Sequence, residues 1–387
     1  MKILHIISDM DPKAGGVSQA VRTMIKGLEK LNTMNAVVCL NRDDSSFLAG
    51  SAFPVFALGP GSTAWNINGK LQRWLKDHIG QYDAAILHGL WQFQSYALLK
   101  SIRFSDKTRL FVMPHGMLDP YFQRAPGRKL KAIRNLIFWN LLERHVIKKA
   151  HGMLFTCEAE KLLAREAFNR YHPRAELVVG LGVEPPPPYT ESQVSGFLAE
   201  FPQQLDTDDY LLYIGRIHPK KGVDMLIEAY LTLKRSGEPN MPQLVIAGPG
   251  LETDYGQRIK EMAAGEPTII FTGMLVGDLK WAAFYGCQAF VLPSHQENFG
   301  IAVVEALACG KSVLISNQVN IWREIKRQNA GIISPDTLAG TEEMLKSWIA
   351  KPAKEKSAMG IQARQAYEIY FTVEQAAAKL MSVLIQQ

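Results

Sequence analysis

The chain has 387 residues, of which 47% are hydrophobic and 21% are charged. This balance is typical of globular domains and excludes a disordered, collagen-like or coiled-coil protein, and the length predicts two or three domains. The sequence contains no run of 18 apolar residues that would predict a membrane span. Lysine and arginine outnumber aspartate and glutamate by six, so nucleic acid, an anionic membrane and a phosphorylated small molecule are the partners to consider.

Three further features narrow the compartment and the partner. The apolar run that opens the chain meets Asp9 and lacks a cleavage site, so it predicts a first strand and not a signal peptide. The cysteines lie far apart and form no C-x-x-C pair, which argues against zinc or disulfides and predicts a reducing, cytoplasmic environment. These cysteines are Cys39, Cys157, Cys287 and Cys309. No helix-turn-helix, zinc-finger or RNA-binding signature is present, so we expect no nucleic-acid partner.

In the first half of the chain, short apolar or β-branched runs alternate with amphipathic stretches. We expect strands at 3–7, 36–40, 83–87, 110–113 and 152–156, and helices at 18–31 and 129–150. Strands separated by helices predict right-handed crossovers, and therefore a parallel sheet with helices on both faces.

Four consecutive prolines at 185–188 predict a stiff extended connector, because proline cannot enter a helix interior or a central strand. Beyond it we expect strands at 210–214, 243–247, 268–271, 289–292 and 312–315, and helices at 223–236, 254–264, 301–309 and 361–387. The sequence thus predicts an α/β protein with two doubly wound domains, 1–188 and 189–365. Ligands of open α/β sheets bind beyond the carboxyl ends of the strands, so we expect a ligand in a cleft where the two domains face each other.

The strongest functional signal follows the expected strand at 289–292. There Gly300 opens a helix, where the free amides and the helix dipole favour a pyrophosphate. Glu305 lies about 7.5 Å further along the helix axis at the rise of an α-helix, which suits a carboxylate that accepts hydrogen bonds from both ribose hydroxyls. Glu297 precedes the helix, on the side where a transferred group would lie.

Three more signals follow other strands. Arg216 and Lys221, between Gly215 and Gly222, place two cations at a strand end, which suits the charge of a departing diphosphate. A Gly15-Gly16 pair follows the first strand, and His115-Gly116 follows the strand at 110–113. Taken singly, a glycine pair or a histidine at a strand end is usually structural, and cations near a turn are commonly solvated. All four signals at strand ends of two matched domains favour a functional site.

These motifs resemble glycosyltransferase family 4. The resemblance rests on Glu297 and Glu305 with seven residues between them, Phe299-Gly300, Gly215-Arg216 with Lys221-Gly222, Gly15-Gly16 and His115-Gly116, and it covers nearly the whole chain. It implies a retaining, nucleotide-sugar-dependent enzyme of the bacterial polysaccharide type with the two-Rossmann GT-B fold. It also implies that the final helix, about 366–387, packs back on the N-terminal domain. Ser312 departs from the family, which often has proline there.

The resemblance also implies roles for individual residues. The expected catalytic residues are His115, Arg216, Lys221 and Glu297. The expected nucleotide-sugar-binding residues are Gly15, Gly16, Gly215, Arg216, Lys221, Met274, Leu275, Glu297, Asn298, Phe299, Gly300, Ile301 and Glu305.

Within this set, Arg216 and Lys221 would neutralise the diphosphate, and the Gly300 and Ile301 amides would hold it. Glu305 would bind the ribose, and the turn at 273–275 would receive the base. The donor sugar would meet Glu297, Phe299 and His115, and Gly16 would close over the phosphates beside the acceptor.

We expect no metal requirement. Asp9-x-Asp11 and Asp206-x-Asp208 match the DxD pattern of metal-dependent glycosyltransferases, but about one such match is expected by chance in a chain like this. Neither lies where the phosphate signals converge. The two cations and the helix terminus can replace a metal.

The expected reaction moves a hexose from a nucleoside diphosphate sugar, first of all UDP-glucose, to a glycan or lipid-linked acceptor with retained anomeric configuration. A retaining glycosidase needs two carboxylates about 5–5.5 Å apart, and no convincing nucleophile is present. We therefore expect a front-face reaction, in which the departing phosphate takes the proton of the acceptor.

A strongly basic window, 124–149, contains eight cations and one acid, Glu143. It also contains Leu130, Ile133, Ile137, Phe138, Leu141 and Leu142 at roughly helical spacing. The favoured interpretation is a core-facing helix with a solvated basic face. The alternative is contact with an anionic membrane or a lipid-diphosphate acceptor at the inner face of the plasma membrane. By position alone, Trp91, Tyr121 and Phe122 are acceptor-side candidates.

Other functions remain open from the sequence. A nucleotide-sugar epimerase can share the fold, and a nucleotide-binding module without transferase activity is a further alternative. A Rossmann oxidoreductase is disfavoured, because Thr253 stands where the third glycine of G-x-G-x-x-G belongs after Gly248 and Gly250. A P-loop reading of Gly310-Lys311-Ser312 fails, because Glu305 occupies the position of its first glycine.

Overall fold

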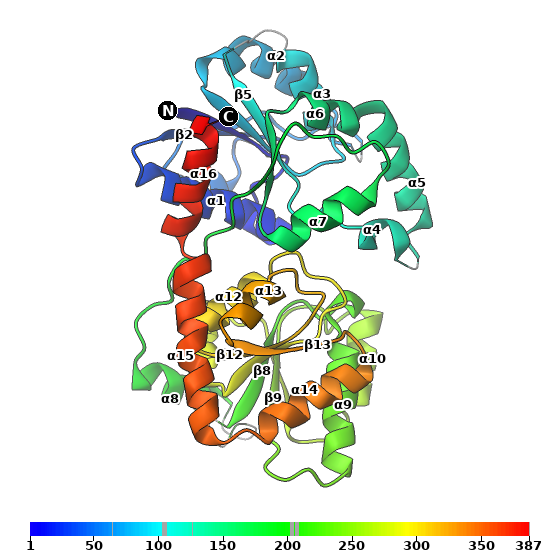
Figure 1. The fold of residues 1–387 in the computed structure, drawn as a ribbon, viewed down its shortest axis with the longest axis vertical. Helices are drawn as coiled ribbons and strands as arrows, with labels where there is room; N and C mark the ends of the chain where they lie inside the picture. Colours follow the sequence, from blue (N-terminus) through cyan, green and yellow to red (C-terminus); the bar gives the residue numbers. More distant parts are fainter. Residues whose placement is uncertain (64, 103–106, 126, 202–204, 206–208, 387) are drawn as a thin grey trace. The chain divides into compact units, whose positions relative to one another are not determined.

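The computed structural model describes the chain except for residues 64, 103–106, 126, 202–204, 206–208 and 387. The chain forms two compact units (Figure 1). Unit 1 contains Met1–Gly182 and Val373–Gln387, and unit 2 contains Val183–Thr372.

A seven-stranded, fully parallel sheet forms the centre of unit 1, in the order β3-β2-β1-β4-β5-β6-β7. Its strands are β1 (Lys2–Ile6), β2 (Met34–Cys39), β3 (Val55–Ala57), β4 (Ala84–His88), β5 (Arg109–Met113), β6 (Gly152–Phe155) and β7 (Glu176–Val178). The central strands are apolar and almost wholly buried, as expected of a sheet covered on both faces.

The helices of unit 1 connect successive strands, and the chain returns at its end to cover the same unit. They are α1 (Gly16–Glu29), α2 (Gly69–His78), α3 (Phe93–Ser101), α4 (Tyr121–Arg124), α5 (Lys129–Phe138), a π-helical turn (Trp139–Glu143), α6 (Arg144–Lys149), α7 (Glu158–Ala167) and α16 (Val373–Gln386). Leu380 and Leu384 of α16 pack in one core cluster with Met24 and Leu28 of α1. A side chain at Gly27 would collide with Val373, so this glycine permits the close approach of α16 to α1.

Unit 2 repeats the plan with a six-stranded, fully parallel sheet in the order β10-β9-β8-β11-β12-β13. Its strands are β8 (Tyr210–Ile214), β9 (Gln243–Ala247), β10 (Ile269–Gly273), β11 (Ala289–Leu292), β12 (Ser312–Ser316) and β13 (Gly331–Ser334). Its helices are α8 (Glu191–Glu200), α9 (Val223–Arg235), α10 (Asp254–Met262), α11 (Gly277–Gly286), α12 (Ile301–Ala308), α13 (Trp322–Arg327), α14 (Leu338–Ile349) and α15 (Ala353–Tyr370).

Both sheets have the doubly wound order, in which the strand order reverses next to the first strand of the unit. The reversal lies between β1 and β4 in unit 1 and between β8 and β11 in unit 2. The expected α/β class and the two doubly wound sheets are therefore confirmed. All ten predicted strands are present, and among the described residues the sequence missed three short outer strands, β3, β7 and β13.

Two details of the chain path differ from the sequence prediction. The expected single helix at 361–387 consists of two helices, α15 and α16, because the backbone leaves the helical conformation at Phe371 (φ −126°, ψ 4°). Along the chain, unit 1 ends at Gly182 and unit 2 begins at Val183, so the proline run belongs to unit 2. There the Tyr285 hydroxyl donates to the Pro187 carbonyl at 2.6 Å.

All four cysteines are free thiols and are buried. Burial raises the pKa of Cys39, and it raises the pKa of Cys287 to about 11 and that of Cys309 to about 12. No helix within the described residues is both long and apolar enough to cross a membrane.

Candidate functional site

In unit 2 the two strongest sequence signals follow the two strands that flank the reversal of the sheet. The loop at 215–222 follows β8, and the loop at 293–300 follows β11. Hydrogen bonds hold the loops side by side, because the amide of His295 and the hydroxyl of Ser294 both donate to the Lys220 carbonyl at 2.9 Å. The structure thus brings these two predicted motifs together at the carboxyl ends of the strands, where doubly wound sheets bind ligands.

Glycines allow the backbones of these loops to touch. Gly222 has φ +67°, and a side chain there would overlap the Pro293 carbonyl oxygen. Gly248 has φ +143°, and a side chain there would overlap the Gly215 carbonyl oxygen. Sequence reasoning identified Gly215 and Gly222 but considered Gly248 only as part of an incomplete dinucleotide motif. Its position after β9, the neighbour of β8, is the signal that could have found it.

Lys221 and Glu297 form an ion pair across the two loops. Their side chains are only 15% and 17% exposed. Burial lowers the pKa of the Lys221 ammonium, and the cations of Lys220 and Arg216 lower it further, while contact with the Glu297 carboxylate favours the charged form. The sequence predicted separate roles for these two residues, and it did not predict that they pair.

The backbone of Glu297 is fixed by a segment that sequence reasoning missed. The Glu297 amide donates to the Gln318 carbonyl at 3.0 Å, and the Glu297 carbonyl accepts from the Asn320 amide at 2.9 Å. The Asn320 side chain also donates to Asn298 at 3.4 Å. This segment follows β12, the next strand of the sheet, so strand order alone indicates it as a support of the site.

Arg216 is exposed, and its guanidinium makes no hydrogen bond or ion pair with the residues that the structure describes. The Tyr213 hydroxyl fixes the backbone here, because it donates to the Arg216 carbonyl at 2.9 Å. A guanidinium held near Lys221 by the backbone but without an anionic partner is suited to bind an anionic ligand.

The helix predicted to hold a diphosphate begins where expected. Gly300 has φ +78°, a conformation that favours glycine, and α12 begins at Ile301. Glu305 lies in α12, and its carboxylate is 2.7 Å from the Lys280 ammonium of α11. Burial raises the pKa of Glu305, and Lys280 opposes this shift. No motif marks Lys280, which sequence reasoning missed.

Three further residues predicted to bind the nucleotide sugar, Phe299, Met274 and Leu275, differ in how far their side chains are exposed. Phe299 is 4% exposed and packs edge-on against Phe371, with ring centroids 5.8 Å apart. A ligand would therefore meet the backbone at Phe299. At the turn after β10, Met274 is 68% exposed, whereas Leu275 is buried.

Unit 1 has its own cavity at its strand-order reversal. This cavity, of about 260 Å³, is lined by His88 at the end of β4 and by residues that follow β1 and β4, including Asp9, Gly15 and Gln92. Gly15 has φ +136° and precedes α1, which begins at Gly16, two residues before the predicted start at Ser18. His115 is joined to His88 through ring nitrogens 3.0 Å apart.

The acceptor-side candidates lie in unit 1. The Trp91 amide donates at 2.7 Å to Glu143, a buried carboxyl whose pKa burial raises to about 7. Tyr121 and Phe122 begin α4, and the Arg128 guanidinium lies 5.0 Å from the centre of the Phe122 ring.

In the basic window, 124–149, the structure differs from the favoured interpretation of a core-facing helix. Leu130, Ile133, Ile137 and Leu141 are 84%, 57%, 53% and 74% exposed, so the apolar face of α5 and the following turn points to solvent and not into the core. The helix instead buries Asn135 and Trp139. The expectation of a core-facing apolar helix was wrong for these four residues, whereas Leu142 packs against the core of unit 1 as expected. Spacing alone cannot tell which side of a helix the rest of the protein covers.

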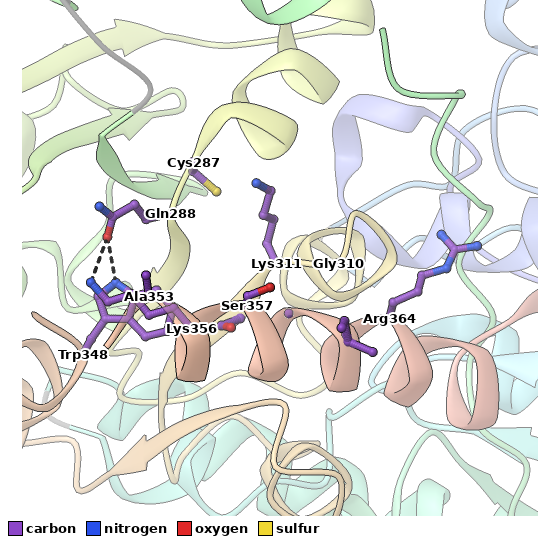
Figure 2. Close-up of a pocket in the computed structure, with 12 residues that line it drawn as sticks. Cys287, Gln288, Gly310, Lys311, Trp348, Ala353, Lys356, Ser357 and Arg364 are labelled. Carbon is purple, nitrogen blue, oxygen red and sulfur yellow. Dashed lines mark hydrogen bonds between the residues drawn. The ribbon is translucent and has the colours of Figure 1, made fainter. Parts of the chain in front are cut away.

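A cavity in unit 2, of about 550 Å³, contains none of the predicted site residues (Figure 2). It lies at the amino ends of the strands, beside the first residues of β11 and β12, and so away from the motif loops. Lys311, Lys356 and Arg364 line it. Gln288 accepts hydrogen bonds there from Trp348 at 3.2 Å and Lys356 at 3.5 Å.

The structure describes only one of the two D-x-D patterns, the one at Asp9 and Asp11. Asp9 accepts hydrogen bonds from the Asp11 amide at 2.8 Å and from Asn41 at 2.7 Å. Asp206 and Asp208 lie outside the described residues. Within the described part of the chain, no three His, Cys, Asp or Glu residues gather in a way that could hold a metal ion. Metal independence stays a prediction.

Two family models match the chain. Residues 15–182 match the family described as glycosyl transferase 4-like domain, and residues 198–366 match glycosyl transferases group 1. Together the matches span most of the chain, one in each unit.

Curated relatives match over shorter stretches. An uncharacterized glycosyltransferase of Methanocaldococcus jannaschii, MJ1607, is 30% identical over 148 residues, which cover 37% of this chain and 37% of that protein. O-antigen chain mannosyltransferase B of Escherichia coli is 30% identical over 118 residues, which cover 30% of this chain and 31% of that protein. The matched stretches therefore span only about a third of these relatives.

The fold has close counterparts among solved structures. The crystal structure of Anabaena Alr3699/HepE in complex with UDP and glucose matches with a TM-score of 0.74 at 17% identity, covering 100% of both chains. At this identity the likeness shows the fold alone, and it confirms the expected GT-B fold.

Proposed function

Because the chain belongs to the GT4-type glycosyltransferases, we propose that it transfers a hexose from a nucleoside diphosphate sugar to a glycan or lipid-linked acceptor with retained anomeric configuration. UDP-glucose is the first donor to test. The observation that carries the proposal is the joining of the cationic loop after β8 to the loop that precedes α12, through Lys221 and Glu297.

The leaving diphosphate is the centre of the proposed mechanism. When a donor binds, its phosphates replace Glu297 as the partner of Lys221, and Arg216 supplies a second positive charge. Both cations then oppose the negative charge that grows as the glycosyl bond breaks. The first amides of α12 add donors for the same oxygens.

The exchange of partners also prepares the sugar subsite. Once Lys221 binds phosphate, the Glu297 carboxylate is free to accept hydrogen bonds from sugar hydroxyls. Gln318 and Asn320 keep its backbone in place throughout. Glu305, whose burial favours a bound partner, accepts the ribose hydroxyls in place of Lys280.

Retention is proposed to follow a front-face path. The departing phosphate takes the proton of the acceptor hydroxyl while that oxygen attacks the same face of the sugar. The protein contributes position and electrostatic stabilisation and no covalent intermediate. We propose that no metal is required, because Arg216, Lys221 and the start of α12 supply the charge that a metal would supply.

We further propose that unit 1 contacts an anionic membrane, on the cytoplasmic side where nucleotide sugars are made. The support is the exposed apolar face of Leu130, Ile133, Ile137 and Leu141, which lies among the cations of the 124–149 window. An interfacial helix has this combination of an apolar face and flanking cations. A lipid-linked acceptor would be reached from this surface.

A panel of nucleotide sugars tests the function. The full chain is incubated with UDP-glucose, other UDP-hexoses and the nucleotide form of mannose, the last suggested by the mannosyltransferase relative. With a glycan acceptor present, we measure release of the nucleoside diphosphate, and NMR identifies the anomer of the product. Both measurements are made with EDTA and with EDTA plus Mn²⁺. Release with retention in EDTA supports the proposal. Conversion of the donor sugar without an acceptor supports an epimerase, and inversion or strict dependence on Mn²⁺ contradicts the proposed mechanism.

A further inference from the structure

Three histidines of unit 1 form a continuous hydrogen-bonded chain. His5 Nδ1 lies 3.0 Å from His88 Nε2, and His88 Nδ1 lies 3.0 Å from His115 Nε2. Each pair of rings has centroids 5.3 Å apart and planes within 30° of each other, so the rings lie edge to edge and nearly in line.

The sheet places these side chains. His5 lies on β1, His88 ends β4, and His115 follows β5, and these strands are neighbours in the order β1-β4-β5. The register pairs His5 with Ile86 and His88 with Met113. Each histidine is thus two residues beyond the partner of the one before it, which puts His5 and His88 on the same face of the sheet and His115 two residues past the end of β5.

The inner end of the chain has a fixed direction. His5 Nε2 lies 3.3 Å from Asn35 Oδ1, and the Asn35 amide nitrogen donates to Thr33 at 2.9 Å. Because an amide oxygen only accepts, His5 must carry its proton on Nε2. A neutral imidazole has one donor and one acceptor nitrogen, so His5 Nδ1 accepts from His88 Nε2, and His88 Nδ1 accepts from His115 Nε2.

The chain is neutral because it is buried. His5 is fully buried and His88 is 2% exposed. Burial lowers the pKa of His5 and of His115 to about 4, and burial together with the neighbouring histidines lowers the pKa of His88 well below its usual value. Protonation of His5 or of His88 at Nδ1 would also place two N–H groups face to face. At neutral pH each ring therefore has one N–H and one lone pair.

The outer end is partly exposed at His115, and Nδ1 of this ring has no hydrogen-bond partner among the residues that the structure describes. We propose that Asn35, His5 and His88 are positioning residues, which hold His115 as the Nε2–H tautomer and present its Nδ1 as a hydrogen-bond acceptor for a hydroxyl of a sugar ligand. The identity of the ligand rests on the proposed function, whereas the tautomer does not. His115 then acts as an acceptor of a hydrogen bond and not as a cation.

The experiment uses the full chain labelled with ¹⁵N-histidine and long-range ¹H–¹⁵N correlation spectra at pH 7. The expected wild-type result is a protonated Nε2 and a bare Nδ1 at His5, His88 and His115. A protonated Nδ1 at His115 overturns the proposal, as would follow if the Asn35 amide were reversed. Because this measurement needs no substitution and no ligand, it decides the matter even if a variant fails to fold.

Two pairs of variants test the coupling. Asn35→Leu removes the acceptor and should release His115 into a mixture of tautomers, whereas Asn35→Asp keeps an acceptor and should leave His115 unchanged. His88→Phe should also release His115, whereas His88→Gln keeps one donor and one acceptor and should restore the wild-type tautomer. If both Asn35→Leu and His88→Phe leave His115 unchanged while circular dichroism shows a folded protein, the proposal is wrong.

Activity gives a separate readout. In His88→Phe we expect diphosphate release to fall about tenfold, since a fixed acceptor for one hydrogen bond is worth about 1.4 kcal/mol, and His88→Gln should recover most of it. If the spectra agree with the proposal but no nucleotide sugar is turned over, the tautomer chain stands and the proposed function fails.

Discussion

Lys221 and Glu297 are an ion pair between two loops that are 76 residues apart in the sequence. Each loop follows a strand that flanks the reversal of the unit 2 sheet. The pair therefore links the cationic motif to the motif that opens α12. Because a largely buried charge is costly to leave unpaired, an anionic ligand that displaces Glu297 would have to supply the missing partner of Lys221.

Loss of either cation of this site should lower turnover. We expect Lys221→Ala and Arg216→Ala each to reduce kcat by roughly 10²–10³, the usual effect of removing one group that stabilises developing negative charge. Lys260→Ala, at an exposed position on α10, is the control for loss of a lysine outside the site. Release of the nucleoside diphosphate at saturating donor measures the effect. Equal losses at Lys260 and Lys221 would contradict the assignment.

Loss of the carboxylate at position 305 should weaken nucleotide binding. Hydrogen bonds to charged groups contribute about 1.5–3 kcal/mol, so Glu305→Gln should raise the Kd for UDP about 10- to 100-fold in calorimetry. Glu343→Gln, an exposed position on α14, should not change it. Wild type should discriminate against 2′-deoxy-UDP, and Glu305→Gln should lose that discrimination. If the variant still discriminates, Glu305 does not bind the ribose.

A pair of glycine-to-alanine variants distinguishes the energetic cost of backbone strain from that of steric overlap. Gly222 and Gly237 have similar backbone angles, φ +67° and +74°, but only at Gly222 would a side chain meet another group, the Pro293 carbonyl. Gly237→Ala should lower the free energy of unfolding by about 1 kcal/mol, and Gly222→Ala by clearly more. Urea unfolding measures both. Similar losses would mean that the two loops move apart at little cost.

The stability of the protein should fall as the pH drops below 6.5. The pKa of His5 is lowered from 6.5 to about 4, so between these values the unfolded chain binds more protons than the folded one. Stability then rises with pH through this window, by roughly 3 kcal/mol for one such histidine. His5→Gln should flatten the dependence of Tm on pH between 4.5 and 6.5. His172→Gln, at an exposed position, should leave it unchanged, and a similar flattening there would argue against burial as the cause.

The exposed apolar face of α5 should bind anionic vesicles. We expect the full chain to sediment with vesicles that contain phosphatidylglycerol at low salt and to be released by high salt. Ile137→Ser with Leu141→Ser should weaken this binding about tenfold or more without lowering Tm, because both side chains are exposed. Ile361→Ser, an exposed apolar position in unit 2, is the control. Unchanged binding in the double variant would refute the surface.

The central parts of the fold were predictable because they are set by local patterns. Strands such as β8 and β11 are apolar runs bounded by glycine or proline, and parallel pairing leaves little choice in how they assemble. The edge strand β3 was not predictable, because it has three residues, none of them fully buried. The break at Phe371 also has no local signal, since no glycine or proline marks it.

The candidate site was predictable in its motifs but not in its pairings. Arg216, Lys221, Glu297 and Glu305 each follow from a pattern after a strand. That Lys221 contacts Glu297, and that Lys280 contacts Glu305, depends on the order of strands and helices in space. The histidine chain needs even more, because the positions of His5, His88 and His115 coincide only when the register of three strands is known.

The buried cysteines have a practical consequence. Thiol reagents attack the thiolate. All four thiols are buried, and burial raises the pKa of Cys39, Cys287 and Cys309, which disfavours their reactive form. A single cysteine introduced at an exposed position of either unit should therefore react alone with a maleimide dye. The native chain can in this way carry site-specific fluorophores without removal of its own cysteines, and ligand-dependent motion can be followed in the otherwise unmodified enzyme.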